Sequence, residues 1–120
     1  MTEQDPETIP VIIGVGQIND RPEQPGDGLD PVGLMAEALR RADADAGGGV
    51  LEDCDSLAVV AQLAWPQLNP VDGKVAEALG IHPSHCMQTA MPNGDSPILL
   101  LNEAANRIGR GESRICAVTG

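Results

Sequence analysis

Residues 85–120 decide the fold, and they run HCMQTAMPNGDSPILLLNEAANRIGRGESRICAVTG. This order predicts a strand at residues 84–90, a tight turn, an apolar helix opened by Pro97, and a strand at residues 115–118. A helix that begins directly after a buried strand directs unpaired backbone N–H groups, and the positive end of its dipole, at the turn before it. We therefore expect the turn at residues 91–97 to bind an acyl oxyanion, a phosphate or a thiolate, although it contains no cysteine, histidine or lysine.

The helix after this turn is rich in apolar residues. A helix that is apolar nearly all round has no side for solvent, so we expect this one to be deeply buried. One face carries Ile98, Leu101, Ala105 and Ile108, and Leu99, Leu100 and Ala104 lie beside it.

The upstream sequence predicts the same alternation of strands and helices. Residues 11–16 form a continuous β-branched run, typical of a strand that is buried on both faces of a parallel sheet. Next come a helix capped by Asp30 and ended by glycines 47–49, a strand at 57–61, and a short helix at 75–79 stopped by Gly80. This order predicts the α/β class, with a layered, mostly parallel sheet that carries helices on its faces.

The domain organisation is expected to be simple. Residues 1–9 are polar and acidic, and we expect them to be disordered. Residues 10–120 suffice for a single core, which we predict to be one partial domain. Because the sequence stops inside a predicted strand, we expect a truncated, N-terminal part of a larger protein.

Composition excludes several classes of protein. The 18 acidic and 7 basic residues give a net charge of -11, which repels nucleic acid and anionic membrane surfaces. The sequence contains neither a run of about 18 apolar residues nor a signal peptide, so no membrane span is expected. The 3 cysteines are odd in number and lie in apolar runs, which indicates reduced thiols and a cytoplasmic location.

Two apparent motifs are better explained by packing. Residues 14–16 follow a predicted strand as in a dinucleotide-binding turn, but Pro22 and Pro25 prevent the helix that must follow at once. The glycines there favour close approach of a neighbouring backbone. His82 and His85–Cys86 have no fourth ligand at a recognised spacing, so no metal site is predicted.

The possible nucleophiles are also weak candidates. Cys86 and Cys116 fall inside predicted strands, where burial makes a thiol a small hydrophobe and raises its pKa. Ser96 stands directly before Pro97, which favours a role as helix N-cap, with Asp95 adding a favourable charge at the dipole. The alternative, in which Ser96 is the nucleophile of a Gly-Asp-Ser hydrolase, needs a histidine from elsewhere.

Four segments together resemble the N-terminal half-domain of the thiolase superfamily, and most of all the divergent members labelled acetyl-CoA acetyltransferases. The segments are residues 10–17, the acidic loop leading to residues 29–31, residues 55–60 and residues 102–112. This resemblance implies a thiolase-like half-domain of βαβαβαβ order.

The resemblance also assigns roles within the turn. In thiolases the acyl-accepting cysteine lies in a Cys-x-Ser-Gly turn, whose cysteine, serine and glycine correspond here to Gly94, Ser96 and Pro97. Covalent acyl transfer needs a thiolate, which glycine lacks. Asp95 would also raise the pKa of a thiol placed beside it. The turn amides could still hold a carbonyl or phosphate oxygen.

Three functions stay open at this point. The resemblance implies the N-terminal fragment of an acyl-CoA acyltransferase, of the acetyl-CoA acetyltransferase type, whose nucleophile position is Gly94. The alternatives are a non-catalytic protein that binds acyl-CoA or a partner, and the Ser96 hydrolase. The resemblance implies a coenzyme A thioester as substrate, no further cofactor, and a homo-oligomer formed through residues 84–91; no catalytic residue is assigned. The expected substrate-binding residues are Asn93, Gly94, Asp95 and Ser96.

Overall fold

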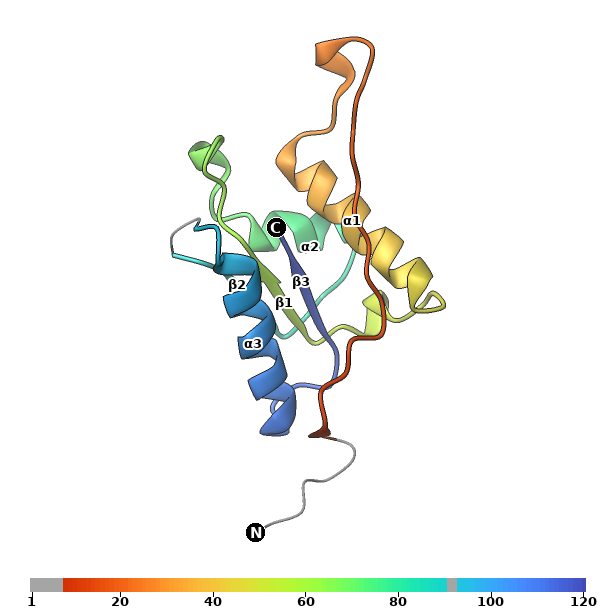
Figure 1. Ribbon diagram of the computed structural model, residues 1–120, viewed down its shortest axis with the longest axis vertical. Coiled ribbons are helices and arrows are strands. Elements are labelled where there is room, and N and C mark those ends of the chain that lie inside the picture. The colour runs from red at the N-terminus through yellow and green to blue at the C-terminus, as the bar shows by residue number, and fades with distance from the viewer. Residues whose placement is uncertain (1–7, 91–92) are drawn as a thin grey trace.

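The computed structural model describes residues 8–90 and 93–120, and within them three α-helices surround a three-stranded parallel sheet (Figure 1). The strand order is β2-β1-β3, and both neighbours of β1 run parallel to it. The predicted α/β class with a parallel sheet is therefore confirmed. The elements are α1 (Pro31–Asp45), β1 (Ser56–Val59), α2 (Asp72–Leu79), β2 (His85–Gln88), α3 (Ser96–Gly109) and β3 (Cys116–Thr119), with short 3-10 turns at Pro25–Asp27, Leu51–Asp53 and Pro66–Leu68.

Local signals define the ends of α1 and α2. The Asp30 carboxylate accepts a hydrogen bond from the Gly33 N–H at 2.7 Å, so Asp30 caps α1 as predicted. Glycines 47–49, all with positive φ, follow α1. Gly80 ends α2 at φ 68°, a left-handed conformation that glycine adopts without steric cost.

The core lies between the sheet and the pair α1–α2. Leu57 and Val59 of the central strand are 0% exposed, as expected for a strand covered on both faces. The crossovers β1–α2–β2 and β2–α3–β3 run in opposite directions, so right-handed connections place α2 and α3 on opposite faces (Figure 1). The main cluster consists of Met35, Leu39, Leu57, Val59, Val71, Val75, Ala76 and Ile81.

The predicted first strand at residues 11–16 is wrong. This segment is extended but joins no sheet, and it runs alongside α1 (Figure 1). Val11 and Ile12 are 70% and 68% exposed. A β-branched run becomes a strand only where another strand pairs with it, and this segment lies against α1 without pairing to any strand of the described sheet.

The expected deep burial of α3 is also wrong. Leu100 and Ala104 are buried where α3 packs against β1 and β3. Ile98 and Leu101, by contrast, are 68% and 42% exposed. The reason is geometric: one helix face contacts the sheet, and no described element covers the neighbouring face.

Candidate functional site

The turn before α3 lies at the carboxyl end of the sheet. The chain leaves β1 towards α2 and leaves β2 towards α3, and these helices cover opposite faces. Adjacent strands whose connections diverge in this way open a crevice, which is where α/β proteins usually bind ligands. The Ala61 N–H donates to Thr89 Oγ1 at 3.0 Å, which joins the two strand ends beside this crevice. The sequence reasoning did not anticipate this role for Thr89.

Hydrogen bonds within the turn fix its shape. The Asn93 N–H donates to Ser96 Oγ at 3.0 Å, and the Ser96 N–H donates to the Asn93 carbonyl at 3.1 Å. Ser96 is 1% exposed, whereas Asn93, Gly94 and Asp95 are exposed. The structure therefore places three of the four predicted binding residues on the surface of the turn and buries the fourth. Met91 and Pro92, the start of the predicted turn, lie outside the described residues.

The predicted N-cap is displaced by one residue. Asp95 occupies the N-cap position of α3, and Ser96 is the first helical residue. The Ser96 hydroxyl accepts from the turn behind it, and the Asp95 side chain makes no capping hydrogen bond. Proline is tolerated anywhere in the first turn of a helix, so Pro97 does not define which residue precedes the helix.

Only part of the helix terminus is available to a ligand. Pro97 has no N–H, and those of Ser96 and Leu99 donate to carbonyls of Asn93 and Asp95. Among the described residues, this leaves the N–H groups of Asp95 and Ile98 without a partner at this end of α3. Two amides can still hold one carbonyl or phosphate oxygen.

Space does not require glycine at position 94. A Cβ atom built on Gly94 meets no other atom within 4 Å, and its φ is not positive. A larger side chain therefore fits here without strain.

The cysteines do not supply a replacement nucleophile. Burial raises the pKa of Cys54 to about 11, and its Sγ donates to the Ser56 carbonyl at 2.9 Å. Burial, assisted by the charge of Asp72, raises the pKa of Cys86, as expected from its place in a strand. All 3 cysteines are free thiols. In the part of the chain that the structure describes, no three His, Cys, Asp or Glu side chains lie close enough together to hold a metal ion.

The close packing predicted for glycines 14 and 16 is confirmed, against a helix rather than a strand. A Cβ on Gly14 would contact the Ala42 carbonyl of α1. Two hydrogen bonds hold the segment there: the Val15 N–H donates to Asp45 Oδ2 at 2.9 Å, and Arg41 Nη1 donates to the Gln17 carbonyl at 3.1 Å.

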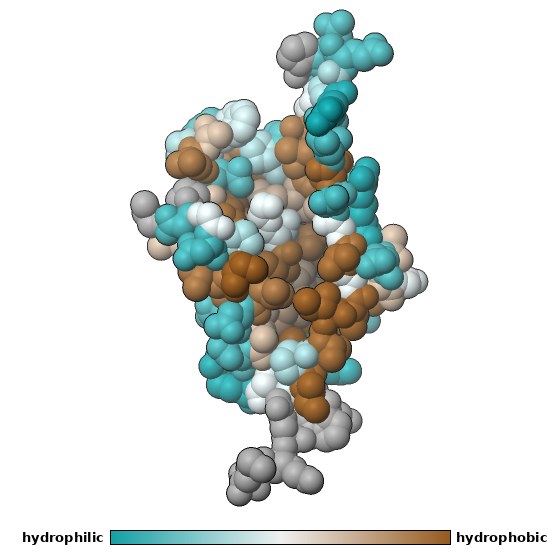
Figure 2. Space-filling view, in the orientation of Figure 1, coloured by the Kyte–Doolittle hydropathy of each residue, from teal (hydrophilic) through white to brown (hydrophobic). Residues whose placement is uncertain are grey.

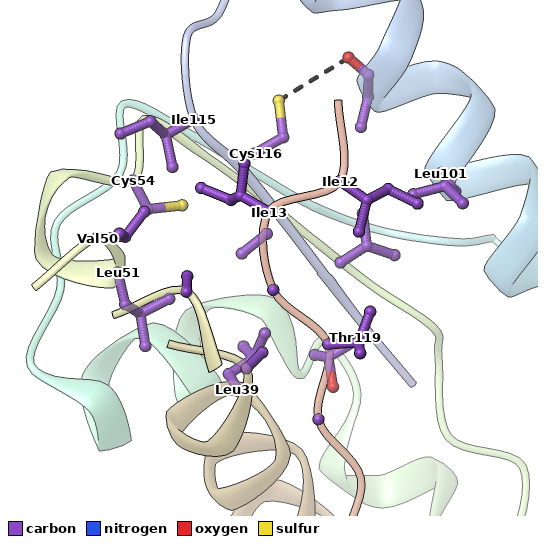
Figure 3. Close-up of a pocket in the computed structure, with 18 of the residues that line it drawn as sticks. Ile12, Ile13, Leu39, Val50, Leu51, Cys54, Leu101, Ile115, Cys116 and Thr119 are labelled. Carbon is purple, nitrogen blue, oxygen red and sulfur yellow. Dashed lines mark hydrogen bonds between the residues drawn. The ribbon is translucent and has the colours of Figure 1, made fainter. Parts of the chain in front are cut away.

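A second feature was missed at the sequence level. An apolar cavity of about 620 Å³ lies between residues 10–16, α1, α3 and β3 (Figure 3). Ile12 and Leu101 lie together on one side of it, and Leu39 and Thr119 lie at another. The signal was present in two apolar stretches, residues 11–15 and the face of α3, each of which was predicted to be buried.

Comparison with known proteins identifies the architecture. No protein-family model matches the chain, and neither does any curated protein. A solved structure does match: the monomeric SCP2-thiolase like protein type 1 (STLP1) from Mycobacterium smegmatis, with a TM-score of 0.75 and 28% identity over 98% of this chain. The fold is thiolase-like. This thiolase-like chain spans about a quarter of its neighbour's length, 24%.

No helix among the described residues has the length and apolar character needed to cross a bilayer.

Proposed function

We propose that this chain supplies the acyl-binding turn of a thiolase-like protein that acts on coenzyme A thioesters. The proposal depends on one observation: in a thiolase-like fold, the exposed turn 93–95 stands at the start of α3 and at the carboxyl end of the sheet. The amides of Asp95 and Ile98 would hold the thioester carbonyl oxygen. The acetyl-CoA acetyltransferase type, inferred from the resemblance, is the activity we assign to the complete protein.

Within this proposal, the turn binds without forming an acyl-enzyme. Gly94 carries no sulfur, and the serine beside it is buried. A non-catalytic protein that binds acyl-CoA or a partner is therefore the second candidate function. Trapping after incubation with acetyl-CoA tests whether the turn binds without acylation: we expect no acylated peptide covering residues 89–101 by mass spectrometry. An acyl group on that peptide would contradict binding without chemistry.

Binding itself has a separate test. Acetyl-CoA titrated into the chain should shift the NMR amide signals of Asp95 and Ile98. Asp95→Asn should strengthen binding, because the carboxylate repels both the carbonyl dipole and the coenzyme's phosphates. Glu103→Gln is the matched control, since it removes the same charge from an exposed position farther along α3. Unchanged signals at both amides would refute the proposed site.

The serine hydrolase hypothesis is disfavoured by burial. Ser96 is 1% exposed and its Oγ accepts a hydrogen bond from the Asn93 backbone. A nucleophile must approach a substrate carbonyl, and this hydroxyl faces the turn that encloses it. We expect no labelling of Ser96 by an organophosphonate probe, and labelling would restore the hypothesis.

The quaternary and cellular inferences stay predictions. β2 lies at an edge of the sheet, where a second copy could pair with it, so the prediction of a homo-oligomer through residues 84–91 stands. Residue 91 lies outside the described part of the chain. STLP1 is described as monomeric. Light scattering after size-exclusion chromatography decides between a homo-oligomer and a monomer. The cysteine content still leads us to expect a cytoplasmic location.

A further inference from the structure

The loop between β1 and α2 projects beyond the sheet and presents apolar side chains to solvent (Figure 1). Residues 62–69 form this loop, here called the Trp65 loop. Leu63 and Trp65 are 77% and 50% exposed. Figure 2 shows apolar surface where the loop stands out at the upper left of the molecule. Trp65 is the only Phe, Tyr or Trp residue of the chain, and an exposed aromatic side chain is typical of a contact site.

Hydrogen bonds give the Trp65 loop a defined shape. The Gln62 N–H donates to Asn69 Oδ1 at 2.9 Å, and Asn69 Nδ2 donates to the Gln62 carbonyl at 3.1 Å, which closes the loop at its base. Within the loop, the Leu68 N–H donates to the Trp65 carbonyl at 3.0 Å, and the Leu68 side chain packs against the main core cluster. Compact loops whose ends are joined in this way frequently carry function.

The Trp65 loop leaves the sheet next to the turn 93–95. β1 and β2 are neighbouring parallel strands, so the loop that follows β1 and the turn that follows β2 start from the same edge of the sheet. The hydrogen bond from the Ala61 N–H to Thr89 Oγ1 joins the two segments just before they diverge. Neighbouring strands lie about 4.8 Å apart, so a ligand group bound at the turn starts close to the base of the loop.

The charge of this region favours an apolar ligand group over a phosphorylated one. Residues 56–71, which include the whole Trp65 loop, contain no acidic or basic residue, although the chain has a net charge of -11. The nucleotide part of coenzyme A carries phosphates, which need cationic partners. Lys74 of α2 already donates from Nζ to the Leu68 carbonyl at 2.6 Å. An acyl chain needs no cation, and it is stabilised by contact with Leu63 and Trp65 because both surfaces then leave water.

We propose that Leu63 and Trp65 bind the acyl chain of a coenzyme A thioester whose acyl group is longer than acetyl. The inference rests on the proposed function, which places the thioester carbonyl at the turn 93–95 and so starts the acyl chain beside the Trp65 loop. The loop then determines specificity, because it favours a medium-chain group such as octanoyl over acetyl. Each methylene group that leaves water on binding contributes up to about fourfold in affinity.

The fluorescence of Trp65 tests this contact directly, because the chain has one tryptophan and no tyrosine. Octanoyl-CoA titrated into the chain should shift the emission to shorter wavelength, since the acyl chain displaces water from the indole ring. Acetyl-CoA should not shift it. Octanoyl-CoA should also bind at least about tenfold more tightly than acetyl-CoA, which requires the burial of only about two of its additional methylene groups.

The variant Leu63→Ser separates binding of the acyl chain from binding of the carbonyl. It should weaken octanoyl-CoA binding about fivefold and leave acetyl-CoA binding unchanged. Because Leu63 is 77% exposed, the fold should tolerate this change. Ile9→Ser is the matched control: Ile9 is 48% exposed and precedes the segment that packs on the C-terminal half of α1. This control should alter neither affinity, and equal octanoyl-CoA affinities of Leu63→Ser and the unmodified chain would overturn the proposal.

Three further results would also overturn it. The first is unchanged Trp65 emission with octanoyl-CoA while the amide signals of Asp95 and Ile98 shift, which would remove the role of the loop and leave the turn as a binding site. The second is the same emission shift with coenzyme A alone, which would assign the loop to the nucleotide. The third is the same emission shift caused by protein concentration alone, which would assign the loop to a second copy. If neither thioester shifts the Asp95 and Ile98 amides, the proposed function itself is refuted, and this inference with it.

Discussion

Replacing Gly94 by cysteine tests whether the turn can carry a thiol. A Cβ at this position meets no atom within 4 Å, and the backbone has no positive φ. We therefore expect Gly94→Cys to change the free energy of unfolding by no more than about 0.5 kcal/mol. Urea denaturation measures this, and a loss of several kcal/mol would contradict the open geometry of the turn.

The pKa of the introduced thiol then reports the electrostatics of the turn. The start of α3 favours a thiolate, but the exposed carboxylate of Asp95 opposes it. Two charges about 6 Å apart in water interact by about 0.7 kcal/mol, which corresponds to about half a pKa unit. Adding Asp95→Asn should therefore lower the thiol pKa by about half a unit. Adding Glu103→Gln instead should leave it nearly unchanged.

The measurement is the rate of iodoacetamide alkylation against pH, followed by mass spectrometry at position 94. Cys54 is an internal reference, because its buried thiol has a pKa of about 11 and reacts slowly near neutral pH. The half-unit difference should shrink in high salt, because exposed charges are screened. Equal thiol pKa values with and without Asp95→Asn would refute the argument that the Asp95 carboxylate raises the pKa of a thiol at position 94.

Three further outcomes follow from the described contacts. Asp55 accepts hydrogen bonds from Ser113 and from backbone N–H groups at the start of β3, so Asp55→Ala should lower the free energy of unfolding by about 2 kcal/mol in urea. Desolvation is the largest single effect on the pKa of Asp55 and raises it, but the hydrogen bonds together hold this pKa below its usual value. The Asp55 carboxylate therefore stabilises the folded chain above about pH 4, and this stabilisation is lost as the pH falls through the folded pKa. Gly14→Ala should release the segment from α1, accelerating exchange of the Val15 amide; Gly26→Ala, where a Cβ meets nothing within 4 Å, should not. Wild-type Cys54 should resist alkylation at pH 7 until the chain unfolds, and rapid labelling would contradict its burial.

The sequence predicted those elements whose signals are local. Asp30 and Pro31 start α1, and Gly80 ends α2, because capping and left-handed backbone depend on residues within one turn. The strand predicted at residues 57–61 was recognisable because all five residues are apolar, which is typical of a central parallel strand; the structure places this strand at Ser56–Val59.

The candidate site was predicted in position but not in detail. The turn lies where the order of elements placed it, at the start of α3. The burial of Ser96 could not be predicted, because it depends on the hydrogen bond that the Asn93 N–H donates to the Ser96 hydroxyl. Pro97 did not fix the first residue of α3 either, because proline is tolerated at any position in the first turn of a helix. Thr89 reaches Ala61 across 28 residues, a pairing that no local pattern encodes.

The two errors in the fold prediction concern neighbouring parts of the structure. Residues 11–16 were expected to be a buried strand and the Ile98–Leu101 face of α3 to be covered, and both prove exposed along the apolar cavity beside β3. Pattern and propensity agree with the native fold in a well-specified sequence, so a local disagreement has a physical reason. Two independent patterns fail here at one place, the apolar cavity that both segments line. The disagreement therefore has a tertiary rather than a local origin, since both segments line the apolar cavity beside β3 and no described element covers them.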